Sequence, residues 1–347
     1  MDGLMNVVGI GVISANGRGI NSHKESLSRG WVPPSGKLAY CVSAESLNDK
    51  LVLKEMRRAD RFSKMAALAA WDAVQDSGID LDELKSSLGI IVATAFGAHA
   101  TTFRFLDDIL DYGDDNVSPT AFSNSVHNAA GSYIASILGN QGPVLTMTQL
   151  VASFHQALIL AESWIKEGRC RNVLVGSVDE YADVMEYICS RKLTIAEDGK
   201  IRPFLFTKMP ASVPGEGSSF FLVTDQNSPK KYASISALYD DNVQEPDMLI
   251  LDCDGMVGSE EGYRAIGQTK SLISSYVPIF GSMLTISSFN CAAAALMIKE
   301  QYYYAAPVQD NPHGLNLCKA HQPAAISSIS CLRYGCKGER LQIFLKQ

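Results

Sequence analysis

Short, continuously apolar runs alternate with segments of helical period along this chain of 347 residues. Leu88–Ala95 is an apolar run of strand length, and Arg58–Ser77 has apolar residues at helical spacing. Val144–Thr148 is a further strand-like run, and it leads directly into a helical segment at Ala152–Glu167. Apolar strands that alternate with helices are typical of sheets covered by helices on both faces. We therefore expect an α/β fold with mixed or parallel sheets.

The same alternation begins again after residue 226. The polar segment Gln226–Lys231 contains a proline, which makes it the best candidate for a boundary. We expect a first half over residues 1–225 and a second half over residues 226–347. In the second half we expect strands at Ala233–Leu238, Met248–Asp252, Ala324–Ser330 and Leu341–Leu345, and helices at Glu260–Ile273 and Ser287–Lys299.

Composition narrows the class of protein. Apolar residues make up 46% and charged residues 19%, which is ordinary for a globular protein with a sizeable core. The net charge of −7 argues against a nucleic-acid or anionic-membrane surface, so an acidic partner would need a local basic patch. No apolar run approaches the roughly 20 residues of a membrane span, and the start of the chain lacks a basic signal-peptide region. We expect a soluble, cytoplasmic protein.

Eight cysteines are scattered along the chain without a C-x-x-C pair and without histidines at zinc-binding spacing. This pattern predicts free thiols in a reducing compartment. It predicts neither a metal site nor a bound cofactor.

Five segments, taken in order, carry a family resemblance. They are Val7–Gly30, Ser118–Asn128 with the following Gly131 and Gly142–Pro143, Gly168–Glu180, Arg202–Phe204, and Val213–Val223. Together they resemble the β-ketoacyl synthase family of the thiolase fold, and they span most of the chain. The resemblance implies two related halves, each with a mixed five-stranded sheet, layered between helices. It also implies a dimer that pairs central strands across a two-fold axis.

The resemblance assigns positions to the family's catalytic groups. An ungapped count places Val151 where the family has its nucleophilic cysteine. Asp254 falls at the first catalytic histidine, Gly281 at the lysine and Ile286 at the second histidine. The family's glycine-rich loop near the C-terminus becomes Tyr334–Glu339, and the second half is shortened before the first histidine.

A decarboxylative condensation needs a thiolate to carry the acyl chain and imidazoles to stabilise the enolate. None of these groups remains at its position, so we expect a chain without catalytic residues. The resemblance then implies the chain-length factor, or ketosynthase-β subunit, of a type II polyketide synthase. Such a subunit pairs with an active ketosynthase, to which an acyl carrier protein delivers substrates. It shapes the polyketide tunnel. The product could be an aromatic polyketide or a polyene, and we favour an aromatic one.

Four residues are candidates for the tunnel wall: Thr102, Phe103, Phe105 and Phe122. In the family this region lies at the dimer interface and lines the end of the acyl channel, where bulky side chains would limit chain length. If Phe103 and Phe105 share a helix, they point to different faces, so at most one of them reaches the channel. An ordinary core role is an equal alternative for each.

Two further functions stay open at this point. The chain could be a hydrolase or acyltransferase that reuses the pocket with Ser153 or Cys291, or a homodimeric scaffold without chemistry. Ser153 and His155 do not form a hydrolase pair in the expected helix, because residues two apart point to different faces.

Two side-chain interpretations complete the alternatives. Gln149 resembles the glutamine of decarboxylating relatives, but it lies two residues before the cysteine position at Val151. Asp254 and Glu216 could form a carboxylate pair, although Glu216 lies in a turn motif and is better explained as structural.

Overall fold

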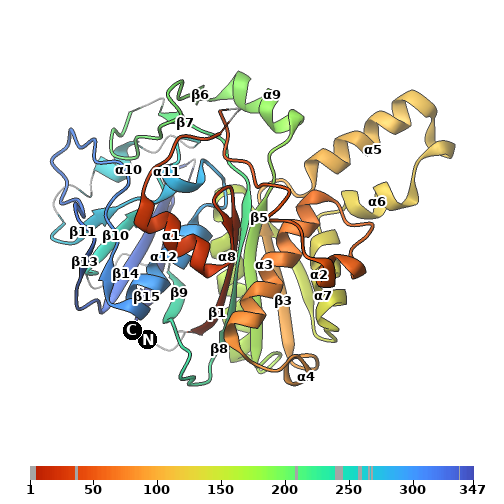
Figure 1. Cartoon of the computed structure of the whole chain (residues 1–347), viewed down its shortest axis with the longest axis horizontal. Coiled ribbons are helices and arrows are strands. Elements are labelled where there is room, and N and C mark those ends of the chain that lie inside the picture. Colours follow the sequence, from red (N-terminus) through yellow and green to blue (C-terminus); the bar gives the residue numbers. More distant parts are fainter. Residues whose placement is uncertain are drawn as a thin grey trace.

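The computed structural model describes residues 5–35, 38–207, 210–238, 245–256, 260–264, 266, 269–335 and 337–347. Within these residues, eleven strands form one continuous mixed sheet (Figure 1). They are β1 (Met5–Ser14), β2 (Gly17–Arg18), β3 (Leu88–Thr94), β4 (Val144–Thr148), β5 (Asn172–Asp179), β8 (Gly217–Thr224), β9 (Ala233–Leu238), β10 (Met248–Leu251), β11 (Leu272–Ser274), β14 (Ser328–Tyr334) and β15 (Arg340–Lys346). Two small ribbons pair β6 (Thr194–Ile195) with β7 (Ala211–Ser212) and β12 (Tyr302–Tyr303) with β13 (Gln322–Pro323).

The large sheet contains two groups of five strands with the same pattern of pairing. In the first group, β1–β8 and β8–β5 are antiparallel, and β5–β3 and β3–β4 are parallel. In the second group, β9–β15 and β15–β14 are antiparallel, and β14–β10 and β10–β11 are parallel. The groups join where β1 pairs with β9. The expected fold of two related five-stranded sheets is confirmed, with the sheets joined edge to edge. The division of the chain between residues 225 and 226 stays a prediction.

Helices flank both strand groups. They are α1 (Ile20–Arg29), α2 (Lys50–Glu55), α3 (Arg61–Ser77), α4 (Leu81–Leu84), α5 (His99–Tyr112), α6 (Pro119–Ser125), α7 (Ala129–Leu138), α8 (Ser153–Lys166), α9 (Asp183–Lys192), α10 (Glu260–Arg264), α11 (Val277–Phe280) and α12 (Ser287–Glu300), with single 3₁₀ turns at Asp114–Asn116 and Leu150–Ala152.

The core has layers because strands bury both of their faces. Side chains alternate along a strand, so Ile91 of β3 enters a central core with α8 and α12, whereas Ile90 and Val92 enter an outer core with α3 and α7. The second group repeats this arrangement. Ile250 of β10 joins the central core, and Leu251 joins a third cluster on the other face. The helices α8 and α12 therefore lie between the inward faces of both groups.

Glycines in the first strand allow a helix to approach its backbone. A Cβ atom on Gly9 would lie 2.1 Å from the carbonyl oxygen of Ala73, and one on Gly11 would lie 2.0 Å from that of Ala69. No side chain fits there, because real Cβ atoms do not approach backbone oxygens so closely. The glycines that interrupt the apolar run of β1 thus determine how tightly α3 packs.

Two expected elements of the second half differ from the structure. The helix expected at Glu260–Ile273 ends at Arg264, and Leu272–Ser274 forms β11 beside β10. A short apolar run fits either element, and the ladder with β10 decides for a strand. The strand expected from Ala324 begins at Ser328, because Gln301 takes up the N–H groups of Ala324 and Ile326 before the ladder starts.

The helices α5 and α6 project from the body of the molecule (Figure 1). We call residues 99–125 the arm. They pack mainly against each other, and of α5 only His99 and Thr101 are buried. No helix in the described residues has both the length and the apolar character needed to cross a membrane.

Candidate functional site

The turn between β4 and α8 holds the residue that sequence analysis assigned to the nucleophile. Val151 lies in the single 3₁₀ turn there, is 7% exposed and packs with Ala95, Leu284 and Leu341. Its neighbour Leu150 has a φ of 47°, a left-handed conformation that is costly for a leucine. An isopropyl group offers no atom that can form a thioester. The assignment of this position to the family's cysteine stays a prediction.

Ser153 holds the turn in its shape. Its hydroxyl accepts the N–H of Gln149 at 2.7 Å and lies 2.9 and 2.8 Å from the carbonyl oxygens of Thr94 and Leu150, to which it donates. Ser153 is fully buried, so it is a structural residue. The side chain of Gln149 is exposed and does not enter the turn.

The neighbouring His155 is also buried in α8. Burial lowers the pKa of His155 to about 3, with a smaller effect from the charge of Arg333. The imidazole is therefore neutral at physiological pH. No hydrogen bond joins it to Ser153.

The segment after β10 holds a buried ion pair at the position assigned to the first histidine. Arg333 of β14 donates from Nη2 to Oδ2 of Asp254 at 2.8 Å, and the two side chains are 1% and 2% exposed. Asp254 also accepts the N–H of Met256 at 3.0 Å. Val257 and Gly258, which follow this segment in the sequence, lie outside the described residues.

The electrostatics of this centre depend on two carboxylates and one guanidinium. Burial opposes the charged form of Arg333, but the carboxylates of Asp254 and Asp252 outweigh it and raise its pKa. Burial raises the pKa of Asp252 to about 6, although Arg333 and hydrogen bonds from Ser287 and Asn290 favour its ionised form. Removing one member of such a pair leaves an uncompensated buried charge.

The positions assigned to the lysine and second histidine lie before α12. Gly281 has a φ of 89°, and a Cβ atom there would lie 2.9 Å from both Gly215 Cα and Tyr40 Cδ2. A lysine could not be placed there without moving its neighbours. Ile286 is fully buried in the central core and directly precedes α12. Its aliphatic side chain offers no proton donor or acceptor.

A carboxylate joins the two halves of the site. Asp179 at the end of β5 accepts from Thr94 and from the N–H of Ala95 with one oxygen, and from the N–H and hydroxyl of Thr285 with the other. These four bonds hold the end of β3 against the segment before α12. Val151 therefore packs beside Leu284, two residues before Ile286.

Little space remains at this centre. A cavity lined by Ala95, Met256, Ser282 and Leu284, among others, has a volume of about 20 Å³. That is room for one water molecule, whereas small-molecule sites have several hundred Å³. The cavity is not lined by Val151, Asp254, Gly281 or Ile286, but by residues next to them in the sequence or in space, such as Ala95, Ser282 and Leu284.

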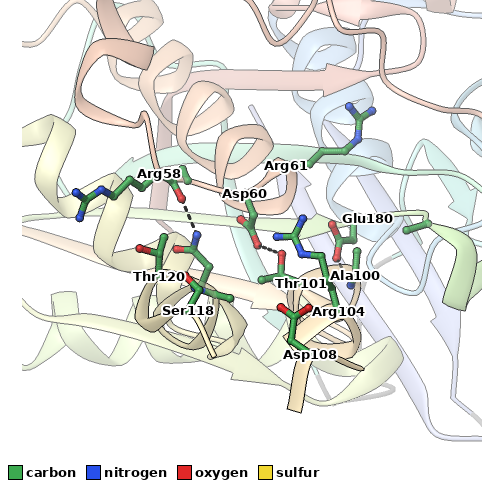
Figure 2. Close-up of a pocket in the computed structure, with 14 residues that line it drawn as sticks. Arg58, Asp60, Arg61, Ala100, Thr101, Arg104, Asp108, Ser118, Thr120 and Glu180 are labelled. Atoms are coloured by element: carbon green, nitrogen blue, oxygen red, sulfur yellow. Dashed lines mark hydrogen bonds between the residues drawn. The ribbon is translucent and has the colours of Figure 1, made fainter. Parts of the chain in front are cut away.

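A larger, open pocket of about 520 Å³ lies between the start of α3 and the arm (Figure 2). Asp60 caps α3 and accepts from Thr101 at 2.8 Å, and Asn124 donates to the carbonyl of Arg58. The guanidinium of Arg104 lies between these walls in Figure 2. Sequence analysis missed this pocket, although three arginines between residues 57 and 61 signal a charged surface.

Glu180 and His99 separate the open pocket from the small cavity. Glu180 lines both spaces and accepts the N–H of Ala100 at 2.8 Å, and its Oε1 lies 3.6 Å from Nδ1 of His99. Burial raises the pKa of Glu180 to about 8, and burial lowers the pKa of His99. Both groups are therefore mostly uncharged at neutral pH. The thiol of Cys189 lines the same small cavity, and burial raises its pKa to about 11.

The proposed carboxylate pair does not form. Glu216 accepts the N–H of Val42 at 2.8 Å and of Tyr181 at 3.1 Å, and it forms an ion pair with Arg61. It therefore holds a turn together, whereas Asp254 pairs with Arg333.

The tunnel candidates all lie on the arm. Thr102 bonds the carbonyls of Ala98 and Ser125 at 2.9 and 3.0 Å and so ties α5 to the end of α6. Phe105 contacts Phe122, with ring centroids 5.7 Å apart, whereas Phe103 is exposed on another face of α5. The expectation that Phe103 and Phe105 point to different faces is confirmed. Their role in a tunnel stays a prediction.

The two cysteines that sequence analysis placed near the assigned positions are poor nucleophiles. Burial raises the pKa of the Cys253 and Cys291 thiols, so neither is a thiolate at neutral pH. The described cysteines are free thiols, and Cys336 lies outside the described residues. No group of histidine, cysteine and carboxylate side chains in the described part of the chain has the arrangement of a metal site.

Comparison with curated proteins finds partial relatives. The chain is 28% identical over 209 residues, 55% of its length, to the pikromycin polyketide synthase component PikAIII of Streptomyces venezuelae, of which it covers 12%. It is 23% identical over 239 residues, 64% of its length, to 3-oxoacyl-[acyl-carrier-protein] synthase 2 of Staphylococcus aureus, of which it covers 59%. The chain thus spans less than two thirds of either relative.

Solved structures share the fold over nearly the whole chain. A β-ketoacyl synthase from Burkholderia phymatum has a TM-score of 0.82 at 14% identity, with 99% of both chains covered. The ishigamide ketosynthase/chain length factor has a TM-score of 0.81 at 17% identity and the same coverage. At these identities the likeness concerns the fold.

A family model described as the N-terminal domain of β-ketoacyl synthases matches residues 35–228, more than half of the chain. The thiolase-like layers described above agree with this match. The chain therefore belongs to the β-ketoacyl synthase family.

Proposed function

We propose that this chain is a chain-length factor. It would be a subunit without catalytic residues that pairs with an active ketosynthase and shapes the tunnel in which a polyketide grows. One observation carries the proposal. Val151, whose side chain has no nucleophilic atom, lies in the turn before α8 and packs against Ala95, Leu284 and Leu341.

The chemistry of condensation cannot proceed on these groups. Valine forms no thioester, and the side chain of Ile286 neither donates nor accepts a proton. The carboxylate of Asp254 would repel an enolate, because both are anions. The nucleophile and the enolate-stabilising groups must therefore come from another chain.

The open end of the sheet supports pairing with that chain. In the described structure, β4 pairs with β3 alone and leaves its other edge free. Leu145 on this strand and Leu150 just after it are exposed. A free strand edge with apolar neighbours is a place where another chain adds to a sheet. An active ketosynthase with the same fold would complete it.

Substrates would reach the partner's cysteine on an acyl carrier protein, and this chain would supply the far wall of the tunnel. The names of two solved structures with this fold agree with such an assembly. One is a ketosynthase/chain length factor, and the other is a type II polyketide synthase carrier protein in complex with its ketosynthase. For this chain, the carrier protein and an aromatic product are part of the proposal.

Co-expression with an intact ketosynthase encoded beside the chain tests the proposal. Native mass spectrometry should find a one-to-one complex. After incubation with malonyl-loaded carrier protein, intact-mass analysis should find acyl groups on the ketosynthase only, and product should form only when both chains are present.

Two variants sharpen the result. A partner whose cysteine is changed to Ala should lose all acylation. Val151→Cys in this chain should gain none, because no imidazole replaces Ile286 or Asp254. Acyl groups on the wild-type chain, or a stable homodimer that hydrolyses acyl thioesters, would contradict the proposal.

The alternative as a hydrolase or acyltransferase has little support in the structure. Ser153 is fully buried and committed to the turn, and Cys291 is fully buried with a raised thiol pKa. The alternative as a homodimeric scaffold is an outcome of the same co-expression experiment.

A further inference from the structure

Glu180 joins the end of β5 to the first turn of α5. Its Oε1 accepts the N–H of Ala100 at 2.8 Å and lies 3.6 Å from Nδ1 of His99. The side chains of Glu180 and His99 are buried, at 2% and 7% exposed. Glu180 lines both the open pocket and the small cavity, and His99 lines the small cavity. The two side chains therefore form a wall, and their movement would join the two spaces.

Hydrogen bonds hold this wall only in part. Nε2 of His99 is buried and has no hydrogen-bond partner in the described structure. A buried polar atom without a partner costs free energy, and a movement that brings water to the ring removes that cost. The next residue but one, Thr101, bonds Asp60 at 2.8 Å, so the first turn of α5 keeps a second attachment when Glu180 moves.

The surroundings of Glu180 oppose its ionisation in this position. Burial has the largest effect and raises its pKa to about 8. The carboxylates of Asp60 and Glu216 raise the pKa further, whereas the N–H of Ala100 and the charge of Arg61 lower it. Arg61 is itself paired with Glu216. The other charged or titratable groups that line the two spaces are Arg58, Arg104, Asp108, Asp179, Tyr181 and Cys189.

The open pocket offers an ionised Glu180 a more favourable position. Its volume of about 520 Å³ leaves room for water and for a side chain to turn. Arg104, about one helical turn after Ala100, also lines this pocket (Figure 2). The guanidinium of Arg104 forms no ion pair within the described part of the chain. Water and an unpaired cation both favour the charged form of a carboxyl group.

We propose that Glu180 is a proton-operated latch on the passage between the two spaces. When protonated, it bonds Ala100 and closes the passage together with His99. When ionised, it turns into the open pocket towards Arg104, and the passage to the small cavity opens. His99 does not cause this response to rising pH, because burial lowers its pKa from 6.5. The inference is independent of the function proposed above.

The direction of the response follows from the two positions of the carboxyl group. In the open pocket its pKa would be close to the ordinary value of 4.5, whereas in the closed position it is about 8. The proton therefore stabilises the closed position, and its loss favours the open one. The ratio of open to closed molecules should rise about tenfold per pH unit until the pH reaches the closed-state pKa, and then stay constant.

Hydrogen exchange of the full chain, followed by mass spectrometry at about pH 6 to 9.5, tests the latch at Ala100. In the wild type, protection of the peptide around Ala100, relative to a free peptide at each pH, should fall about tenfold per unit and then level off. Glu180→Gln keeps the shape and an acceptor for the Ala100 N–H, so its protection should not change with pH. The matched control, Glu197→Gln at an exposed residue, should follow the wild type.

The thiol of Cys189 reports the opening of the passage itself. Cys189 lines the small cavity and is 2% exposed. Iodoacetamide reacts with the thiolate, whose fraction rises about tenfold per pH unit below the thiol pKa. Opening of the latch should add a second factor of about ten, so labelling should rise about a hundredfold per unit in the wild type and about tenfold in Glu180→Gln. Peptide mapping separates Cys189 from the exposed Cys41.

Arg104→Gln tests the position of the ionised carboxylate. It should slow the labelling of Cys189 roughly threefold at each pH, because the open form loses its cation. Equal pH profiles for the wild type and Glu180→Gln would overturn the latch. Unchanged labelling in Arg104→Gln would overturn the turn towards Arg104, and loss of protection at Ala100 without labelling of Cys189 would overturn the opening of the passage.

Discussion

The two halves of the sheet repeat one pattern of pairing but end differently. In the second half, Ile273 of the last strand, β11, bonds the backbone of Asn316 and Cys318, which covers its outer edge. In the first half, β4 has no such neighbour in the described structure, and Leu145 on it is exposed. The same topology is thus closed at one end and open at the other.

Exposed apolar side chains are also distributed unequally between the first and second halves of the sheet. Every large apolar side chain that is exposed in the described structure lies between Val32 and Ile188. The second half instead buries even an arginine, Arg333. A covered strand edge such as that of β11 is not available for pairing with another chain. A free strand edge and an exposed apolar helix face, as in the first half, are surfaces on which another chain can bind. The following predictions test this difference between a closed and an open half.

The largest predicted effect is on folding stability, at the buried ion pair of Asp254 and Arg333 in the second half of the sheet. Arg333→Met should lower the free energy of unfolding by about 3–5 kcal/mol, because Asp254 and Asp252 would be left as uncompensated buried charges. Urea unfolding measures the change. Adding Asp254→Leu should restore much of the loss, and Arg202→Met, which removes an exposed ion pair with Asp198, should cost less than about 1 kcal/mol. An equal cost for Arg333→Met and Arg202→Met would contradict a closed, charge-balanced interior.

The second prediction concerns binding of the ketosynthase at the free edge of β4, in the first half of the sheet. Leu145→Lys should weaken binding of the ketosynthase about thirtyfold, or about 2 kcal/mol, because a lysine on a free strand opposes pairing. The folding stability of the isolated chain should change little, since the side chain is already exposed. Isothermal titration calorimetry measures the affinity, with Leu38→Lys as the control at another exposed leucine. Unchanged affinity would remove β4 from the interface.

At the border of the two pockets, a change in stability with pH is expected that is smaller per pH unit than the effects above. Burial raises the pKa of Glu180 from 4.5 to about 8, so the folded state holds this proton more tightly than the unfolded state does. Its contribution to stability is therefore full below pH 4.5 and is lost as pH rises towards 8, at up to about 1.4 kcal/mol per pH unit. Glu180→Gln should remove this slope while leaving the contributions of other groups. Parallel slopes for the two proteins in urea titrations from pH 5 to 8 would show that Glu180 ionises normally.

The smallest effect concerns the tunnel. Phe122→Ala should lengthen the polyketide by one or two extender units if this ring closes the tunnel against the partner, and it should leave the complex intact. Mass spectrometry of the products measures the change. Phe103→Ala serves as the control on a different face of α5. Products of unchanged length from an intact complex would exclude Phe122 from the tunnel wall.

The sequence predicts most of the fold, because its strands are apolar on both faces. The apolar run at Leu88–Ala95 becomes β3, and the run at Val144–Thr148 becomes β4, which leads into the turn that holds Val151. The apolar spacing wrongly predicted that Leu272 and Ile273 belong to a helix. They form a strand, because they pair with β10, and local spacing does not reveal that pairing. Local spacing also could not predict the arm, because the apolar residues of α5 have no core to face within this chain.

The interior of the site could be predicted only in part. Counting residues places Asp254 at a catalytic position but does not reveal its partner. That partner, Arg333, lies 79 residues further along and reaches Asp254 because β14 pairs with β10. The pairing of two strands that are far apart in the sequence leaves no pattern in the residues of either strand. The resemblance therefore supplies the assignment of Asp254 as a prediction, and the structure supplies the ion pair that the assigned residue forms.

The buried pair of Asp254 and Arg333 also constrains how this protein can change over time. A histidine introduced at position 254 would remove the carboxylate that the Arg333 guanidinium bonds, and a lysine at position 281 would collide with Gly215 and Tyr40. Under the proposed assignment, each of these single substitutions lowers stability, and a return to condensing chemistry requires several changes together. The buried ion pair would then make the regain of catalysis harder than its loss.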